Sequence, residues 1–298
     1  MEPRHLVMLG IPTLVWGTTW YVIKTQIGLV PVEWSVAYRF ILASAVMFAI
    51  AAVRGRTLRF PPRAHLFFLG VGVFQFFGNF NFVYQASEIV TSGLIAVAFA
   101  LLIVPNAFLA WLFFGQRVSR RFMVGAALGI VGVALLFRQE IAALSGTSDL
   151  AWGLSMTVLA VLAASVANVM QAAPSAQGYP MTSLLAWAML YGAGLDIAAA
   201  WATAGPPVFD PSALYVGGVI YLSLFASALA FVLYFSAIRE IGPAVAAYSG
   251  VLVPLVAMLI STAIEGYRWT GPATVGAVLT LLGLVIAFSA RRKPAPPT

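Results

Sequence analysis

The sequence predicts an all-α membrane protein with ten transmembrane helices, arranged as two inverted five-helix repeats around a central cavity with both termini cytoplasmic. Composition gives the first indication. Of 298 residues, 62% are apolar and only 8% are Asp, Glu, Lys or Arg, against roughly a quarter charged in an average soluble domain. So few charges cannot cover a soluble protein of this length, which indicates that lipid covers most of the outside. Positions of the basic residues and an internal repeat supply the other two indications.

Apolar runs bounded by proline, glycine and charged residues predict the helices themselves. Each run is long enough to cross the roughly 30 Å hydrocarbon core of a bilayer. The spans are expected near residues 6–26, 32–53, 66–86, 91–114, 121–138, 151–171, 181–203, 214–236, 244–264 and 271–290. The pairs Pro61-Pro62 and Pro206-Pro207 fall between spans, where a helix-breaking residue costs nothing. The connections are short, so no separate soluble domain is expected.

Basic residues predict the orientation of the spans. Ten spans place both termini on one side, and cytoplasmic loops carry the excess of Lys and Arg. Cytoplasmic termini would leave outside only Lys24, Arg138 and Arg268, with Arg39 inside the second span. The cytoplasmic side would then hold Arg4, Arg54, Arg56, Arg59, Arg63, Arg117, Arg120, Arg121, Arg239, Arg291, Arg292 and Lys293. This strong bias supports the even number of spans as well as their direction.

Residues 102–135 and 251–286 form an internal repeat. Pro105 aligns with Pro254 and Gln116 with Glu265. After a two-residue insertion the same seven-residue glycine spacing recurs, with Gly125 and Gly132 matching Gly276 and Gly283. The chain is therefore predicted to consist of two repeats, residues 1–145 and 146–298. Because five helices is an odd number, the repeats enter the membrane from opposite sides, as in alternating-access transporters. The glycines are expected to allow close helix packing.

Several functional classes are excluded by what the chain lacks. It contains no cysteine and only His5 and His65, so thiolate chemistry is impossible and a histidine metal site is not expected. An enzyme would need a His, Cys or acidic constellation near the membrane midplane, and none can be assembled. The net charge of +7 lies in short clusters between apolar runs, which argues against nucleic acid as a partner. No cofactor is expected.

Polar and aromatic side chains within the spans are the candidate substrate-binding residues, because polar groups inside a membrane are expensive and usually face a cavity. Helical spacing places several of them on shared faces. The candidates are Trp16, Trp20, Tyr38, Gln75, Asn79, Asn168, Gln171 and Tyr248. Each has a structural alternative: tryptophan can pack or anchor at the membrane edge, and an amide can simply bond a neighbouring helix.

Charged residues and prolines in the spans carry further expectations. Arg39 needs either a counter-charge, from Glu33 or Glu88, or a substrate carboxylate. Lys24 ends the first span and either snorkels to the interface or serves the same carboxylate. Pro105 and Pro254 each interrupt a span and either shape the bundle or act as hinges.

Apart from Glu33 at the start of the second span, Asp196 is the one acidic residue assigned to a span, and it is expected toward the outer end of the seventh. No acidic residue is expected near the centre of a span. Transport down the substrate's own gradient is therefore favoured over proton coupling.

Together these motifs resemble a known family. The shared features are the pair Trp16-Gly17, Lys24 at the end of the first span, a proline in the fourth and ninth spans, and a Glu-turn-Gly pattern before the fifth and tenth. They are similar to the drug/metabolite transporter superfamily of the EamA type, and within it to the YddG-type exporters of aromatic amino acids. Gln116 departs from the family pattern, which has Glu there. The resemblance implies a basket of helices around a central cavity, with the fifth and tenth helices peripheral.

The expected function follows from the repeat, the aromatic interior and this resemblance. We expect an exporter in the bacterial inner membrane that moves small amphipathic metabolites, foremost aromatic amino acids, by alternating access. Trp, Tyr, Asn and Gln side chains suit a planar zwitterion. Phosphorylated sugars would need convergent Lys or Arg, and the central spans contain only Arg39. Organic cations, purines and other amino acids are the alternative cargoes, and both a monomer and a dimer are compatible with the sequence.

Overall fold

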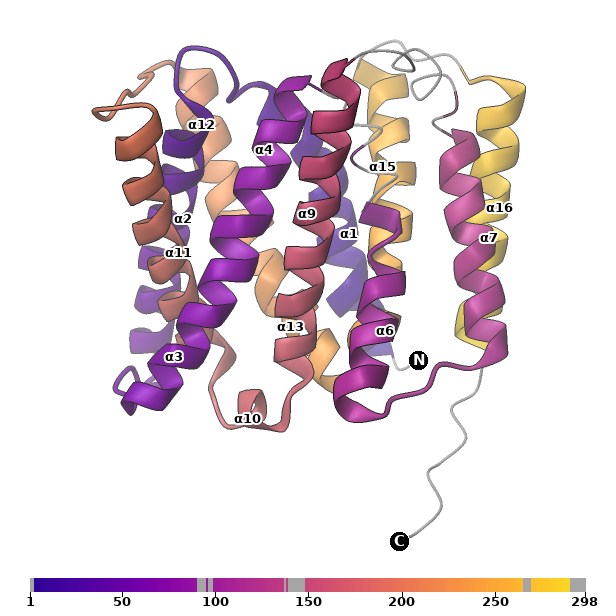
Figure 1. The fold of residues 1–298 in the computed structure, drawn as a ribbon, viewed down its shortest axis with the longest axis horizontal. Coiled ribbons are helices and arrows are strands. Elements are labelled where there is room, and N and C mark those ends of the chain that lie inside the picture. Colours follow the sequence, from indigo (N-terminus) through magenta and orange to yellow (C-terminus); the bar gives the residue numbers. More distant parts are fainter. Residues whose placement is uncertain are drawn as a thin grey trace, which may run out of the picture.

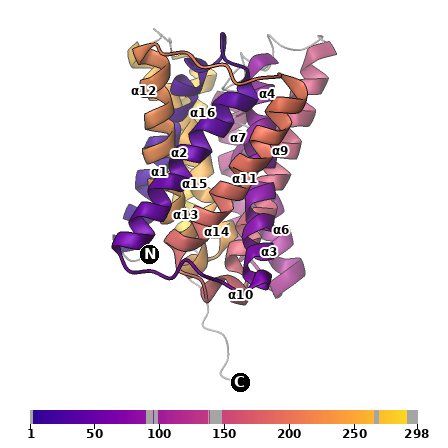
Figure 2. The same cartoon turned by 90° about the vertical axis from the view of Figure 1, so that its left-hand side faces the viewer.

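The computed structural model describes residues 3–89, 95, 99–136, 138, 148–264 and 269–289, and within them every regular element is a helix. The helices stand side by side as a bundle (Figures 1 and 2). They are α1 (Pro3–Lys24), α2 (Val32–Val53), α3 (Pro62–Val71), η1 (Gly72–Asn79), α4 (Phe80–Ile89), α6 (Ile103–Phe114), α7 (Arg120–Leu136), α9 (Ser148–Ala172), α10 (Pro174–Gln177), α11 (Met181–Thr203), α12 (Ala213–Tyr221), η2 (Leu222–Leu229), α13 (Ala230–Ile241), α14 (Pro243–Ala246), α15 (Tyr248–Ile264) and α16 (Gly271–Ser289).

This chain is a multi-pass membrane protein. Seven helical stretches of the described residues are long and apolar enough to cross a bilayer, and α6 and the apolar part of α16 are shorter apolar helices. Large apolar side chains also face outward along the bundle: Leu214 and Phe113 are 67% exposed and Val285 is 64% exposed. A surface of this kind is stable in lipid and unstable in water.

The third and eighth helical stretches share a feature that the sequence pattern did not reveal. Residues 62–89 and 213–241 are longer than the expected spans 66–86 and 214–236, and each contains an eight-residue π-helix, η1 or η2, in its middle. In a π-helix the hydrogen bonds run to the fifth residue instead of the fourth, and such segments are frequent at functional sites. The two stretches hold the same place in the two predicted repeats, and α3 and α12 lie at opposite ends of the bundle (Figure 1).

The glycines of the repeat bring α7 and α16 into direct contact. A Cβ atom added to Gly125 would lie 2.6 Å from the Gly283 carbonyl oxygen, and one added to Gly132 would lie 2.6 Å from the Gly276 carbonyl oxygen. The first glycine of each repeat therefore packs against the second glycine of the other: Gly125 against Gly283, and Gly276 against Gly132. Only glycine permits backbones to approach this closely, so these residues form the packing surface that was expected of them. The α7–α16 pair stands at the side of the bundle (Figure 1).

The two prolines of the repeat lie in different helical surroundings. Pro254 is inside α15, as expected. Pro105 was expected to interrupt the middle of a span, but it occupies the first turn of α6, which begins at Ile103 after a turn at residues 101–102. A proline in the first turn of a helix removes no hydrogen bond. The interruption of the helix therefore lies before Pro105, and this proline sits in the first turn of α6 where a kink within a span was predicted.

Candidate functional site

A cavity of about 110 Å³ lies inside the bundle, lined by residues of α1, α2, η1, α4, α9, α13 and α15 and by Phe99 and Leu102, which precede α6. Six of the predicted site residues line it: Trp16, Trp20, Arg39, Gln75, Asn79 and Asn168. Phe80, Phe99, Phe231 and Tyr234 complete an aromatic wall. The wall comes from helices of both predicted repeats, so the cavity lies between them.

Trp16 is held rigidly in this wall. Its indole Nε1 donates a hydrogen bond of 3.0 Å to the Ala226 carbonyl in η2. Its ring meets those of Tyr234 and Phe231 at centroid distances of 5.0 and 5.4 Å. Trp20, one turn further along α1, packs edge-on against Phe99 at 6.2 Å, but its buried Nε1 has no hydrogen-bond partner among the described residues. One tryptophan is therefore satisfied by the protein, and the other has a free donor at the cavity.

The amides of the cavity bridge neighbouring helices while keeping one acceptor free. Gln75 Nε2 donates to Asn79 Oδ1 at 3.3 Å, and Asn79 Nδ2 donates to the Ala160 carbonyl at 2.9 Å. Asn168 Nδ2 donates to the Tyr234 hydroxyl at 3.3 Å, and its buried Oδ1 finds no partner in the described part of the chain. Asn79 and Asn168 thus link helices and line the cavity at once, whereas the Gln75 bond stays within η1.

Arg39 is the one buried arginine among the described residues, at 1% exposure. Its Nε donates to the Ser227 hydroxyl at 2.8 Å, while Ser223 donates to the Arg39 carbonyl at 2.9 Å, so η2 holds both ends of the residue. The guanidinium lies over the Phe80 ring, 4.4 Å from its centroid. Neither Glu33 nor Glu88 forms an ion pair with it in the described residues, so the expected counter-charge is wrong.

The outer two nitrogens of Arg39 have no carboxylate partner among the described residues. Both Nη1 and Nη2 are buried, and neither makes a hydrogen bond of normal geometry to a described residue, although the buried Tyr84 hydroxyl lies close to the guanidinium. More than nine in ten buried polar groups in proteins are hydrogen-bonded, and an unpaired charged donor is costlier than a neutral one. Arg39 lines the cavity, so an anionic group bound there would lie beside this buried cation.

Asp196 lies deeper in the protein than the sequence suggested. It is fully buried at 0% exposure in α11, where Oδ1 accepts a hydrogen bond of 2.5 Å from Asn81 Nδ2 and Oδ2 has no partner in the described residues. Position along a span does not determine burial, since a residue two-thirds along a helix can face the bundle. Its expected place toward the outer end of the seventh span did not say which way the side chain faces, and the structure turns it into the bundle, although Asp196 does not line the cavity.

Three predicted site residues lie away from the cavity. Tyr38 stacks on Trp34 at 5.8 Å and donates to the Val208 carbonyl. Gln171 accepts a hydrogen bond from Arg239 Nη2 at 3.3 Å. Tyr248 is fully buried and donates to the Gly125 carbonyl at 3.3 Å. In all three the hydroxyl or amide bonds a neighbouring helix or loop, which is the structural alternative.

The side chain of Lys24 lies outside the described residues, and only its backbone at the end of α1 is placed. The described residues also contain no group of three or more His, Cys, Asp or Glu side chains that could hold a metal ion.

Comparison with known proteins identifies the fold. A family model described as the EamA-like transporter family matches residues 5–138 and again residues 151–289. The chain belongs to the EamA-like transporter family. It is a membrane transporter, and its two matches to one model agree with a chain built from two repeats.

Individual relatives of this EamA-like transporter agree with that assignment. The protein PagO of Salmonella typhimurium is 24% identical, covering 97% of this chain and 94% of PagO. A probable amino-acid metabolite efflux pump of the same organism is 26% identical, covering 94% of each chain. The uncharacterized inner membrane transporter YedA of Escherichia coli is 27% identical over 85% of this chain and 80% of its own. One solved crystal structure superposes with a TM-score of 0.79 at 19% identity, covering 96% and 97% of the two chains, and shows the same fold.

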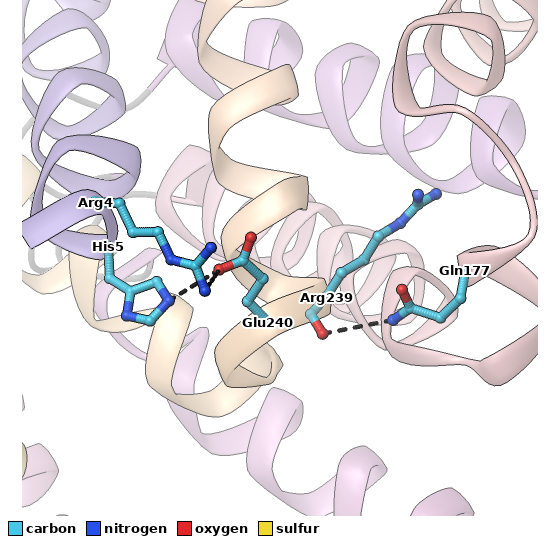
Figure 3. A network of polar contacts seen from close by, with 5 residues as sticks. All are labelled: Arg4, His5, Gln177, Arg239 and Glu240. Atoms are coloured by element: carbon cyan, nitrogen blue, oxygen red, sulfur yellow. Dashed lines mark hydrogen bonds and ion pairs between the residues drawn. The ribbon is translucent and has the colours of Figure 1, made fainter. Parts of the chain in front are cut away.

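At one end of the EamA-like bundle, a polar network joins α1 to α13 (Figure 3). Glu240 accepts from His5 Nε2 at 2.9 Å and pairs with Arg4 at 3.2 Å. The neighbouring Arg239 donates to the Tyr179 carbonyl at 2.9 Å, and its own carbonyl accepts from Gln177 at 3.5 Å. Helices of the two predicted repeats are thereby held together at the end where the chain begins (Figure 1).

Some cavity residues of the transporter were not predicted. Phe231 and Tyr234 were indistinguishable from other aromatic residues of an apolar span. Gly250 had a detectable signal, because it lies four residues before Pro254. A proline inside a helix has no N–H for the carbonyl four residues earlier, so the Gly250 carbonyl lacks its usual helical partner. Gly250 lines the cavity, so the backbone that Pro254 leaves without its usual bond lies at the cavity wall.

Proposed function

We propose that this transporter exports small amphipathic metabolites, foremost aromatic amino acids, by alternating access. The observation that carries the proposal is the set of unpaired polar atoms in an aromatic cavity. Donors without a regular hydrogen bond among the described residues are Trp20 Nε1 and the two outer nitrogens of Arg39, and such an acceptor is Asn168 Oδ1. A zwitterion with a planar side chain would satisfy both kinds of atom.

Each part of such a substrate has a candidate partner in the cavity. The Arg39 guanidinium presents two parallel donors, the geometry that suits a carboxylate. The Asn168 amide oxygen and the Gly250 carbonyl would accept from an ammonium group. Trp16 and Phe231 offer faces and edges for an aromatic ring. The name of the relative that is 26% identical, a probable amino-acid metabolite efflux pump, supports a cargo of this class.

The proposed topology has ten spans, with residues 1–145 and 146–298 as inverted repeats, cytoplasmic termini and a location in the bacterial inner membrane. The basic residues support the orientation through the positive-inside rule, and the name of YedA supports the location. With this topology, the contacts of Arg4 and His5 with Glu240 lie at the cytoplasmic end. Rocking of the repeats would break these contacts when the cavity opens inward.

Transport down the substrate's own gradient remains part of the proposal, because none of the residues that line the cavity is acidic. The same observation disfavours organic cations as cargo, since a cation in an apolar site needs a carboxylate partner. Purines and other amino acids stay as alternatives that the assay below separates.

Proteoliposomes test the proposal directly. Purified protein is reconstituted into vesicles loaded with labelled phenylalanine, and efflux is measured with and without competing tryptophan, threonine, adenine and a quaternary ammonium compound. We expect competition by tryptophan and little by the others. Efflux of an unrelated metabolite without efflux of phenylalanine or tryptophan would refute the substrate class. Concentrative transport driven by an imposed pH gradient would refute the proposed energetics.

A further inference from the structure

An apolar groove on the side of the bundle, separate from the central cavity, lies between α6 and α7. Its volume is about 410 Å³. Ile103, Phe108 and Trp111 of α6 form one wall, and Phe122, Ala126 and Ile130 belong to the other. The groove is open to the surroundings, since Phe108 is 55% and Trp111 48% exposed. It exists because α7 packs chiefly on α16, through the paired glycines.

One end of this groove is strongly basic. Val118 and Phe122, which line the groove, alternate along the chain with Arg117, Arg120 and Arg121. All three arginines are exposed, and no salt bridge joins them to an acid within the part of the chain that the structure describes. An apolar slot and unpaired guanidinium groups therefore adjoin each other.

We propose that this groove is a binding site for an anionic phospholipid, with an acyl chain between α6 and α7 and the phosphate on the arginine cluster. Any lipid could fill an apolar groove in a bilayer, but the three positive charges at its end favour an anionic headgroup. Arginine suits phosphate because its planar fork binds two oxygens at once, and basic pockets beside transmembrane helices are known to select anionic lipids. The bound lipid would support α7 on the side that α16 leaves uncovered.

The chain offers a matched control for the charge. The connection between α2 and α3 also carries three exposed arginines, Arg54, Arg56 and Arg59. None of them lines this groove. Attraction to an anionic membrane surface alone would act on both clusters equally. Selective binding at Arg117, Arg120 and Arg121 requires the groove as well.

The test is native mass spectrometry of the purified full-length protein titrated with phosphatidylglycerol or phosphatidylcholine. We expect one phosphatidylglycerol molecule to bind tightly and phosphatidylcholine to bind with lower affinity. The triple variant R117Q/R120Q/R121Q should lose roughly 100-fold in phosphatidylglycerol affinity, since each basic residue contributes on the order of a fivefold factor. The control R54Q/R56Q/R59Q should retain it. A second variant, Ala127→Phe, fills the groove from α7 and should weaken both lipids.

Three outcomes would overturn the proposal. Equal loss in the two triple variants would show that the attraction is general surface charge. Unchanged lipid affinity in Ala127→Phe would show that the acyl chain lies elsewhere. A dimer that the Ala127→Phe variant converts to a monomer would assign the groove to a second copy of the chain. None of these readouts depends on the transported substrate.

Discussion

Replacing Arg39 by glutamine tests the central assignment, that this guanidinium receives a carboxylate. Glutamine keeps a polar side chain on α2 but removes the charge and the paired donors. Because Nη1 and Nη2 make no regular hydrogen bond to a described residue, the loss should fall mainly on the ligand. A hydrogen bond to a charged group contributes about 1.5–3 kcal/mol. Loss of two such bonds, partly replaced by the amide, should cost about 3 kcal/mol, or roughly 100-fold in affinity.

The assay compares phenylalanine with phenethylamine, which has the same ring and amine but no carboxylate. Binding of both is measured by calorimetry to wild type and to Arg39→Gln in the same detergent. We expect the variant to lose affinity for phenylalanine by about two orders of magnitude and to bind phenethylamine, which lacks the carboxylate, at least as well as the wild type does. The ratio of the two affinities isolates the carboxylate from any general disturbance of the aromatic wall.

Arg239→Gln is the matched control, because Arg239 is also a helical arginine but its guanidinium bonds Tyr179 and Gln171 away from the cavity. It should leave the phenylalanine-to-phenethylamine ratio unchanged. Thermal unfolding of each variant establishes that it is folded. If Arg39→Gln weakened both ligands equally, Arg39 would be a structural residue held by Ser227 and Phe80, and the carboxylate assignment would be refuted.

Three further predictions concern the helix contacts. Gly125→Leu should overpack the contact with α16 and destabilise the protein by about 1–3 kcal/mol, which a lower melting temperature would show. Gly194→Leu is the control, because nothing lies within 4 Å of a Cβ added there, and it should have little effect. Equal shifts in melting temperature would contradict the packing. Glu240→Gln should weaken a partly exposed ion pair worth up to about 1 kcal/mol and raise the inward-open population a fewfold. Labelling of a single cysteine introduced into this cysteine-free chain measures that population. Unchanged labelling would argue against a gate at Glu240. Asp196→Asn should preserve or raise the melting temperature, because a buried carboxylate with one unpaired oxygen costs several kcal/mol if ionised, and a clear drop would show that the charge itself is needed.

Local sequence carried enough information for the helices and for one tertiary contact. Apolar runs and prolines act within a few residues, and in a membrane each helix must satisfy its own backbone, so helix positions could be predicted closely. The glycine spacing of Gly125 and Gly132 also predicted a packing surface, because close backbone approach needs several glycines on one face. The structure then paired them with Gly283 and Gly276.

Side-chain partners were harder to predict. Asn168 and Gln171 are three residues apart on one face of α9, yet Asn168 lines the cavity and Gln171 meets Arg239. Helical spacing places two residues on the same face but does not say which helix stands opposite each of them. Ser227, which holds Arg39, lies 188 residues away in the chain and has no sequence signal linking it to that arginine.

The sequence by itself determined the membrane class, the repeat and the type of side chain available to a ligand, because hydropathy, proline and glycine act locally. Only the tertiary structure decided that Arg39 keeps two donors without a regular hydrogen bond among the described residues, that Asp196 is buried against Asn81, and that Tyr248 packs as scaffold. Those properties depend on how helices distant in the chain rotate and cross, which is fixed by the packing of the whole bundle.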